Sequence, residues 1–160
     1  MSARIHPCLW FDQQAEAAAR FYVAVFPNSK IGAITRYGPG APQPEGTVLT
    51  ISFELDGQPY TALNGGPHFS FSPAVSFVIT CHTQAEVDHY WQHLSARPEQ
   101  ERCGWLVDRY GVSWQIVPQQ LMDFLQHPDA ARRQRVTAAL MAMGKLDIAA
   151  LQQAFDAPTP

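Results

Sequence analysis

The chain has 160 residues, enough for one domain with a sizeable core and too few for two ordinary ones. Apolar residues make up 46% of the chain and charged residues 16%, a balance typical of a folded globular protein. The formal net charge of −3 gives no electrostatic case for nucleic-acid binding, and no apolar run reaches the length of a transmembrane helix. We therefore expect a cytoplasmic protein that binds neither nucleic acid nor membrane. Its three widely spaced cysteines (Cys8, Cys81 and Cys103) fit reduced thiols better than a disulfide framework.

The first half of the chain is typical of the order strand, helix, strand, strand, strand. We expect a helix over residues 15–26, capped by Asp12, and strands over residues 5–11, 30–37, 47–55 and 58–64. The third strand alternates cleanly, with apolar residues on one face and Thr50, Ser52 and Glu54 on the other. Asp56-Gly57 then predicts a hairpin turn.

The second half repeats this pattern, with weaker evidence for its second strand. A capping box from Thr83 to Glu86 predicts a helix that ends near residue 95. We expect strands over residues 75–81, 104–107 and 112–117, and a loop over residues 97–103. A short helix over residues 119–126 follows, and Asp129 and Asp147 begin two more helices that cover a core.

Two modules of one helix and several antiparallel strands predict an α+β fold. We expect residues 1–118 to form a paired βαβββ domain and residues 119–160 to be a helical extension of the same domain. Each sheet would have one face covered by a helix and one free face. Two free faces set side by side would enclose a small-molecule cleft.

A family resemblance rests on strings spread along the chain. These strings cover residues 7–12 (PCLWFD), 26–29 (FPNS), 63–67 (LNGGP), 103–106 (CGWL) and 110–118 (YGVSWQIVP). Together they resemble the PhnB-like proteins, which often carry the label 3-demethylubiquinone-9 3-methyltransferase. These proteins belong to the vicinal-oxygen-chelate superfamily of glyoxalases, bleomycin-resistance proteins and extradiol dioxygenases. The resemblance extends over nearly the whole chain, including the C-terminal helices, and implies the paired βαβββ fold and a homodimer.

The resemblance also implies where a metal centre would lie. Carried over strand by strand, the four ligand positions of the metal-dependent relatives fall on or near His6, Ala62 or Asn64, Ser76, and Gln115. Only His6 is a strong metal ligand, because amide and hydroxyl oxygens are neutral. We therefore predict that the usual metal centre is missing. A divalent metal stays possible but disfavoured, with Glu54 as a replacement oxygen ligand.

His6 and Glu54 are the candidate catalytic residues. His6 alternates with Cys8 and Trp10 along the first strand, which indicates either a cavity wall or a mixed core face with the histidine in solvent. Glu54 lies on the polar face of its strand and is either solvated or enclosed. An enclosed Glu54 would have a raised pKa and could act as a general base.

The candidate ligand-binding residues are Trp10, Asn64, His68, Ser76, Trp105 and Gln115. Asn64 and Gln115 could hold a carbonyl or carboxylate, or equally satisfy backbone groups. His68 is either an acid or base in a flexible loop or a solvated histidine. Trp105 either stacks on a ligand or fills core. The pair His89 and His93 has a zinc-binding spacing, but an incidental pair is favoured over a metal role.

No glycine-rich strand-to-helix turn for S-adenosylmethionine occurs, so we consider the methyltransferase label unlikely. The first hypothesis is an enzyme of isomerase, lyase or hydrolytic type that acts on an oxygenated small molecule. The alternative is a non-catalytic protein of the bleomycin-resistance type, which sequesters an aromatic or cationic compound between Trp10, Tyr60 and Trp105. A dimerising scaffold with a vestigial cleft is the third hypothesis.

Overall fold

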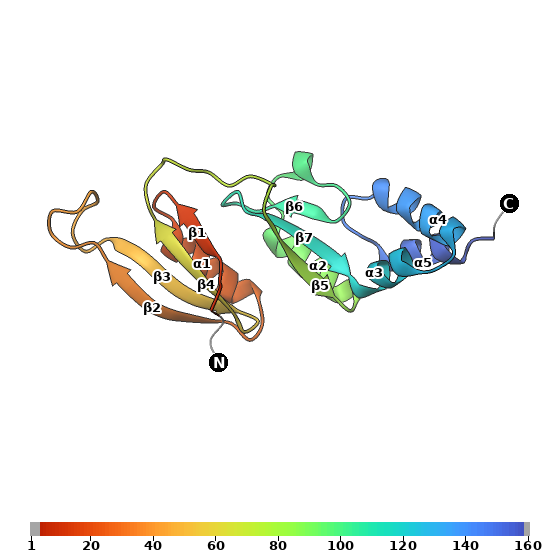
Figure 1. The fold of residues 1–160 in the computed structure, drawn as a ribbon, viewed down its shortest axis with the longest axis horizontal. Helices are drawn as coiled ribbons and strands as arrows, with labels where there is room; N and C mark the ends of the chain where they lie inside the picture. Colours follow the sequence, from red (N-terminus) through yellow and green to blue (C-terminus); the bar gives the residue numbers. More distant parts are fainter. Residues whose placement is uncertain (1–3, 159–160) are drawn as a thin grey trace. The chain divides into compact units, whose positions relative to one another are not determined.

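The structure is a computed structural model that describes residues 4–158 (Figure 1). Helices and short strands alternate along the chain, which confirms the predicted α+β class. The chain divides into two compact units, the first ending at Phe71 and the second beginning at Ser72. The C-terminal helices belong to the second unit. None of the helices in residues 4–158 is long and apolar enough to cross a membrane.

The first unit has the predicted βαβββ order. Its elements are β1 (Cys8–Phe11), α1 (Ala15–Val25), β2 (Lys30–Arg36), β3 (Val48–Leu55) and β4 (Gln58–Asn64). The strands form one sheet in the order β1-β4-β3-β2, in which β1 is parallel to β4 and the other neighbours are antiparallel. Helix α1 packs on one face of this sheet (Figure 1). We call the opposite face the uncovered face of the first sheet.

The alternation of β3 decides which side chains reach each face. Ile51 and Phe53 are buried, and Tyr22 of α1 stacks on Phe53 with ring centroids 6.4 Å apart. Ser52 and Glu54 point the other way and are half-buried. The predicted division into an apolar and a polar face is therefore confirmed. The hairpin turn is also confirmed: Asp56 and Gly57 follow β3 directly and both have positive φ.

Helix α1 does not begin as predicted. Its N-cap residue is Gln14, which makes no side-chain cap hydrogen bond, so the prediction that Asp12 caps it is wrong. The Ala15 N–H instead donates to Oδ1 of Asn64, 2.8 Å away at the end of β4. A long-range amide therefore satisfies the first turn of the helix, in place of a local carboxylate.

The second unit resembles the first but has one strand fewer. Its elements are β5 (Ser76–Cys81), α2 (Gln84–Leu94), the short 3₁₀ helix η1 (Pro98–Gln100), β6 (Trp105–Val107) and β7 (Ser113–Pro118). The sheet order is β5-β7-β6, with β5 parallel to β7. The irregular segment around η1 takes the place in the chain that β2 has in the first unit. The predicted cap of α2 is confirmed by the Glu86 N–H, which donates to Thr83 Oγ1.

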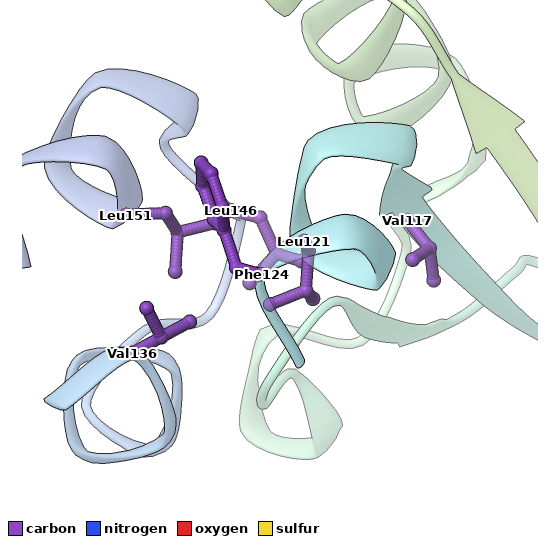
Figure 2. Close-up of a cluster of buried hydrophobic side chains, with 6 residues drawn as sticks. All are labelled: Val117, Leu121, Phe124, Val136, Leu146 and Leu151. Carbon is purple, nitrogen blue, oxygen red and sulfur yellow. The ribbon is translucent and has the colours of Figure 1, made fainter. Parts of the chain in front are cut away.

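Three helices, α3 (Gln119–Gln126), α4 (Ala130–Met141) and α5 (Ile148–Asp156), complete the second unit. Asp129 and Asp147 cap α4 and α5 as predicted. The helices share an apolar core, shown in Figure 2, that consists of Val117, Leu121, Phe124, Val136, Leu146 and Leu151. The segment between α4 and α5 is joined to the turn before β6, because the N–H groups of Cys103 and Gly104 donate to the carbonyls of Met143 and Gly144.

Candidate functional site

A pocket of about 270 Å³ lies on the uncovered face of the first sheet. Thr61 of β4, one of the lining residues, lies opposite Ser52 of β3 and Cys8 of β1 in the sheet register. The Thr61 Oγ1 hydroxyl is 3.2 Å from Nε2 of His6. The pocket is lined by His6, Lys30, Gly32, Ser52, Phe53, Glu54, Pro59, Tyr60 and Thr61. The two candidate catalytic residues, His6 and Glu54, therefore line the same pocket.

The charges in this pocket are paired. The Glu54 carboxylate lies 3.2 Å from the Lys30 ammonium, and the two side chains are 38% and 70% exposed. An exposed pair of this kind contributes at most about 1 kcal/mol and is easily exchanged for another partner. Glu54 is thus a half-exposed carboxylate paired with an exposed ammonium group, with an exposed imidazole in the same pocket.

A bulge in β2 shapes one wall of the pocket. The pairing of β2 with β3 shifts register between Ile31 and Ile34, and there Ser52 Oγ accepts a hydrogen bond from the Ala33 N–H at 2.7 Å. A Cβ on Gly32 would lie 2.5 Å from that hydroxyl oxygen. Any other residue at position 32 would force Ser52 to shift, so Gly32 favours the local shape of the wall.

Trp10 lies on the same uncovered face but packs against the loop that follows β4. Its Nε1–H donates to the Gly66 carbonyl at 2.9 Å, and its ring meets Phe69 edge to face with centroids 5.0 Å apart. A Cβ on Gly65 would lie 2.2 Å from the indole, so the loop lies directly against the ring. The candidate His68 is exposed in this same loop, and neither it nor Trp10 lines the pocket of His6.

Asn64 lies on the opposite, helix-covered face. Besides accepting from Ala15, its amide donates from Nδ2 to the Val48 carbonyl at 3.1 Å, and the side chain is buried. The second ligand position implied by the resemblance, Ala62 or Asn64, is therefore on the covered face. The alternation of Tyr60, Ala62 and Asn64 along β4 is the signal that could have shown this. Tyr60, expected as a cavity wall, stacks on Phe53 with centroids 5.3 Å apart.

The other three predicted site residues come together in the second unit. Gln115 of β7 donates from Nε2 to Ser76 Oγ of β5 at 3.0 Å, and Trp105 lies opposite Gln115 in the register of β6 and β7. Their neighbours Trp114 and Leu106 are buried on the other face, as the sequence predicted for Trp114. Ser76, Trp105 and Gln115 thus share one face of the second sheet.

The donor atoms of these residues fit a divalent metal poorly. Within residues 4–158, no group of three His, Cys, Asp or Glu side chains is close enough to hold a metal ion. In the pocket of the first sheet the strong donors are His6 and Glu54, and Glu54 is paired with Lys30. The remaining side-chain oxygens of this pocket are neutral hydroxyls, which bind such ions weakly without further carboxylates. His89 and His93 are adjacent on α2, with ring centroids 4.4 Å apart, but have no third ligand of these types.

The strand orders of the two sheets and the single helix on each define an α+β protein with two related modules. The family model described as 3-demethylubiquinone-9 3-methyltransferase matches residues 3–117. The chain belongs to this PhnB-like family of the vicinal-oxygen-chelate superfamily, which confirms the resemblance. The match ends at residue 117, before α3, and does not extend to the C-terminal helices.

Solved structures agree with this assignment. A Bacillus cereus protein, named as a PhnB protein and candidate 3-demethylubiquinone-9 3-methyltransferase, is 35% identical, with a TM-score of 0.62 over 72% of this chain and 99% of its own. Protein PA1353 from Pseudomonas aeruginosa shares the fold at 19% identity, with a TM-score of 0.56 over 73% of this chain and 98% of its own. No curated protein matches the chain.

Proposed function

We propose that this PhnB-like protein binds a small oxygenated molecule in the pocket on the uncovered face of the first sheet, without the usual metal of its superfamily. The observation that carries the proposal is that His6 and Glu54 line one pocket, together with the Lys30 cation. A carboxylate, an imidazole and an ammonium group in one small hollow are suited to a ligand with a carbonyl or carboxylate and an acidic proton.

The chemistry that follows is proton transfer. Glu54 would remove a proton from carbon next to a carbonyl, while His6 would donate a proton to, or hydrogen-bond, the carbonyl oxygen. Lys30 would balance the negative charge that develops on the ligand. Isomerase and lyase reactions both begin with such a step, which requires no metal if these three groups surround the ligand.

The alternative is sequestration without catalysis, as in the bleomycin-resistance type. It is favoured by two side-chain contacts in the pocket: Glu54 is paired with Lys30, and His6 with the Thr61 hydroxyl. Both groups are accessible to solvent, whereas a catalytic carboxylate is commonly shielded from it. Binding would then depend on shape and charge alone.

Methyl transfer from S-adenosylmethionine is not part of the proposal, despite the name of the family. Within residues 4–158, two strand-to-helix connections have linking residues, 12–14 and 82–83, and neither contains glycine; β7 runs directly into α3. The common type of S-adenosylmethionine site needs a glycine-rich turn at such a position.

A homodimer and a cytoplasmic location belong to the same proposal. The free thiols of Cys8, Cys81 and Cys103 support a reducing compartment. The family resemblance supports the dimer, and light scattering coupled to size-exclusion chromatography measures its mass directly.

The test combines a thermal-shift screen with proton exchange. Pyruvate, 2-oxoglutarate, acetoacetate and lactate are added to the whole chain and to His6→Gln and Glu54→Gln, with exposed His82→Gln and Glu45→Gln as matched controls. We expect at least one acid to stabilise the chain in a concentration-dependent way, and only the two pocket variants to lose the effect. Deuterium exchange of the ligand's C–H groups that depends on Glu54 supports the enzyme, and binding without exchange supports sequestration. No stabilisation by any of these acids would refute the proposal.

A further inference from the structure

A second pocket, of about 360 Å³, lies in the second unit beside β6. It is lined by Pro73, Glu99, Gln100, Arg102, Trp105, Leu106, Val107 and Ser113. In the first unit the corresponding strand β3 is flanked by β2. Here the segment around η1 takes that place in the chain and forms a wall of the pocket. The volume is within the range of small-molecule sites, which is about 300–1,000 Å³.

Ser113 gives this pocket an unsatisfied polar group. The residue is only 2% exposed, and its Oγ has no hydrogen-bond partner among residues 4–158. A buried hydroxyl without a partner destabilises the protein, and folded proteins contain few such groups. Because Ser113 lines the pocket, a ligand oxygen that binds there can supply the partner that the chain does not.

The other lining groups define the rest of the ligand. The half-buried Trp105 indole offers a flat apolar wall beside Val107, which suits a planar ring. Arg102 is exposed and makes no ion pair within residues 4–158, so its guanidinium is available to a carboxylate. The buried Ser113 and the exposed Arg102 place one polar contact deep in the pocket and one at its mouth.

We propose that this second pocket binds a small planar aromatic acid with an oxygen substituent on the ring, away from the carboxylate. The carboxylate pairs with Arg102, the ring lies on Trp105, and the ring oxygen exchanges a hydrogen bond with Ser113. This pocket shares no lining residue with the pocket of His6 and Glu54, and its lining residues all belong to the second unit.

Isothermal titration calorimetry on the whole chain tests the proposal with three probes. The probe 4-hydroxybenzoate carries both polar groups, benzoate lacks the ring oxygen, and 4-hydroxybenzamide lacks the charge. Ser113→Ala should weaken 4-hydroxybenzoate binding about tenfold and leave benzoate binding unchanged. Arg102→Gln should weaken both acids about tenfold and leave the amide unchanged.

Matched controls separate binding from folding. Ser52→Ala removes a serine of the first pocket and Arg97→Gln an exposed arginine outside the second one, and neither should change the affinity for 4-hydroxybenzoate. Ser113→Ala should keep or raise the thermal midpoint, because it removes an unsatisfied buried hydroxyl.

Three results would overturn the proposal. They are no binding of 4-hydroxybenzoate, an unchanged affinity in Ser113→Ala, and an equal loss for benzoate in that variant. None of these results bears on the thermal-shift screen with His6→Gln and Glu54→Gln, so each proposal can fail alone.

Discussion

Asn64 was predicted to bind ligand, but its hydrogen bonds also stabilise the first unit. Replacing it with alanine separates these two roles. The amide accepts from the Ala15 N–H at 2.8 Å and donates to the Val48 carbonyl at 3.1 Å. Ala15 is fully buried and Val48 nearly so. Asn64→Ala would therefore leave a donor and an acceptor without partners where water has little access.

The magnitude follows from these two bonds. Each buried backbone group left without a partner costs about 1–3 kcal/mol, and loss of an N-terminal cap of a helix typically costs about 1 kcal/mol. Because the Ala15 bond is the cap of α1, the two estimates overlap there. We expect Asn64→Ala to lower the free energy of unfolding by about 3 kcal/mol. This is a large fraction of the roughly 5–15 kcal/mol that stabilises an ordinary domain.

Urea unfolding followed by circular dichroism measures the change, with Gln115→Ala as the matched control. Gln115 is a half-buried amide with one side-chain partner, Ser76, so its loss should cost less than about 1 kcal/mol. Equal and small losses in the two variants would refute the structural role of Asn64. A normal stability together with lost ligand binding in Asn64→Ala would indicate that its ligand role dominates.

Three further predictions concern the second unit. Asp108, fully buried, accepts hydrogen bonds from two backbone N–H groups and from Nε1 of Trp114, so Asp108→Ala should lower the free energy of unfolding in urea by about 3–5 kcal/mol. Leu146→Ala should cost about 2–5 kcal/mol, whereas the exposed Met122→Ala should cost less than about 1 kcal/mol, measured in the same way. Burial, with a smaller contribution from a nearby carboxylate, raises the pKa of Cys81 to about 12, so the folded state favours the neutral thiol. The stabilisation from this thiol should be complete below its ordinary pKa near 9 and should be lost as the pH rises from there toward 12. Denaturant unfolding at pH 8 to 11 should therefore show the free energy of unfolding falling with pH, and Cys81→Ala should remove the part of that fall that this thiol causes.

Most of the fold was predictable because its signals are local. Residues 58–64 and 119–126 have the predicted strand and helix bounds, and Thr83, Asp129 and Asp147 cap the helices that they were expected to cap. The cap of α1 was missed because its acceptor, Asn64, is 49 residues away in the chain. No local pattern identifies such a partner.

The candidate site was predictable in part. The polar face of β3 correctly placed Glu54 on the uncovered side, whereas the alternation around His6 left a cavity wall and a solvated histidine as alternatives. Lys30 as the partner of Glu54 was missed, because the pairing depends on the register of β2 against β3, which a bulge shifts. Arg102 and Ser113 were missed as well, because their pocket depends on an irregular segment beside β6 that no periodic pattern describes.

Methyl NMR provides the most direct test of the central claim, that a ligand binds on the uncovered face of the first sheet. The acid that stabilises the chain most in the thermal-shift screen is titrated into methyl-labelled protein. The account predicts that the Thr61 and Leu63 methyl signals on the uncovered face move and saturate, while the Ile51 and Ala62 signals on the covered face stay in place. Movement of the covered-face signals alone, or of neither set, would contradict it.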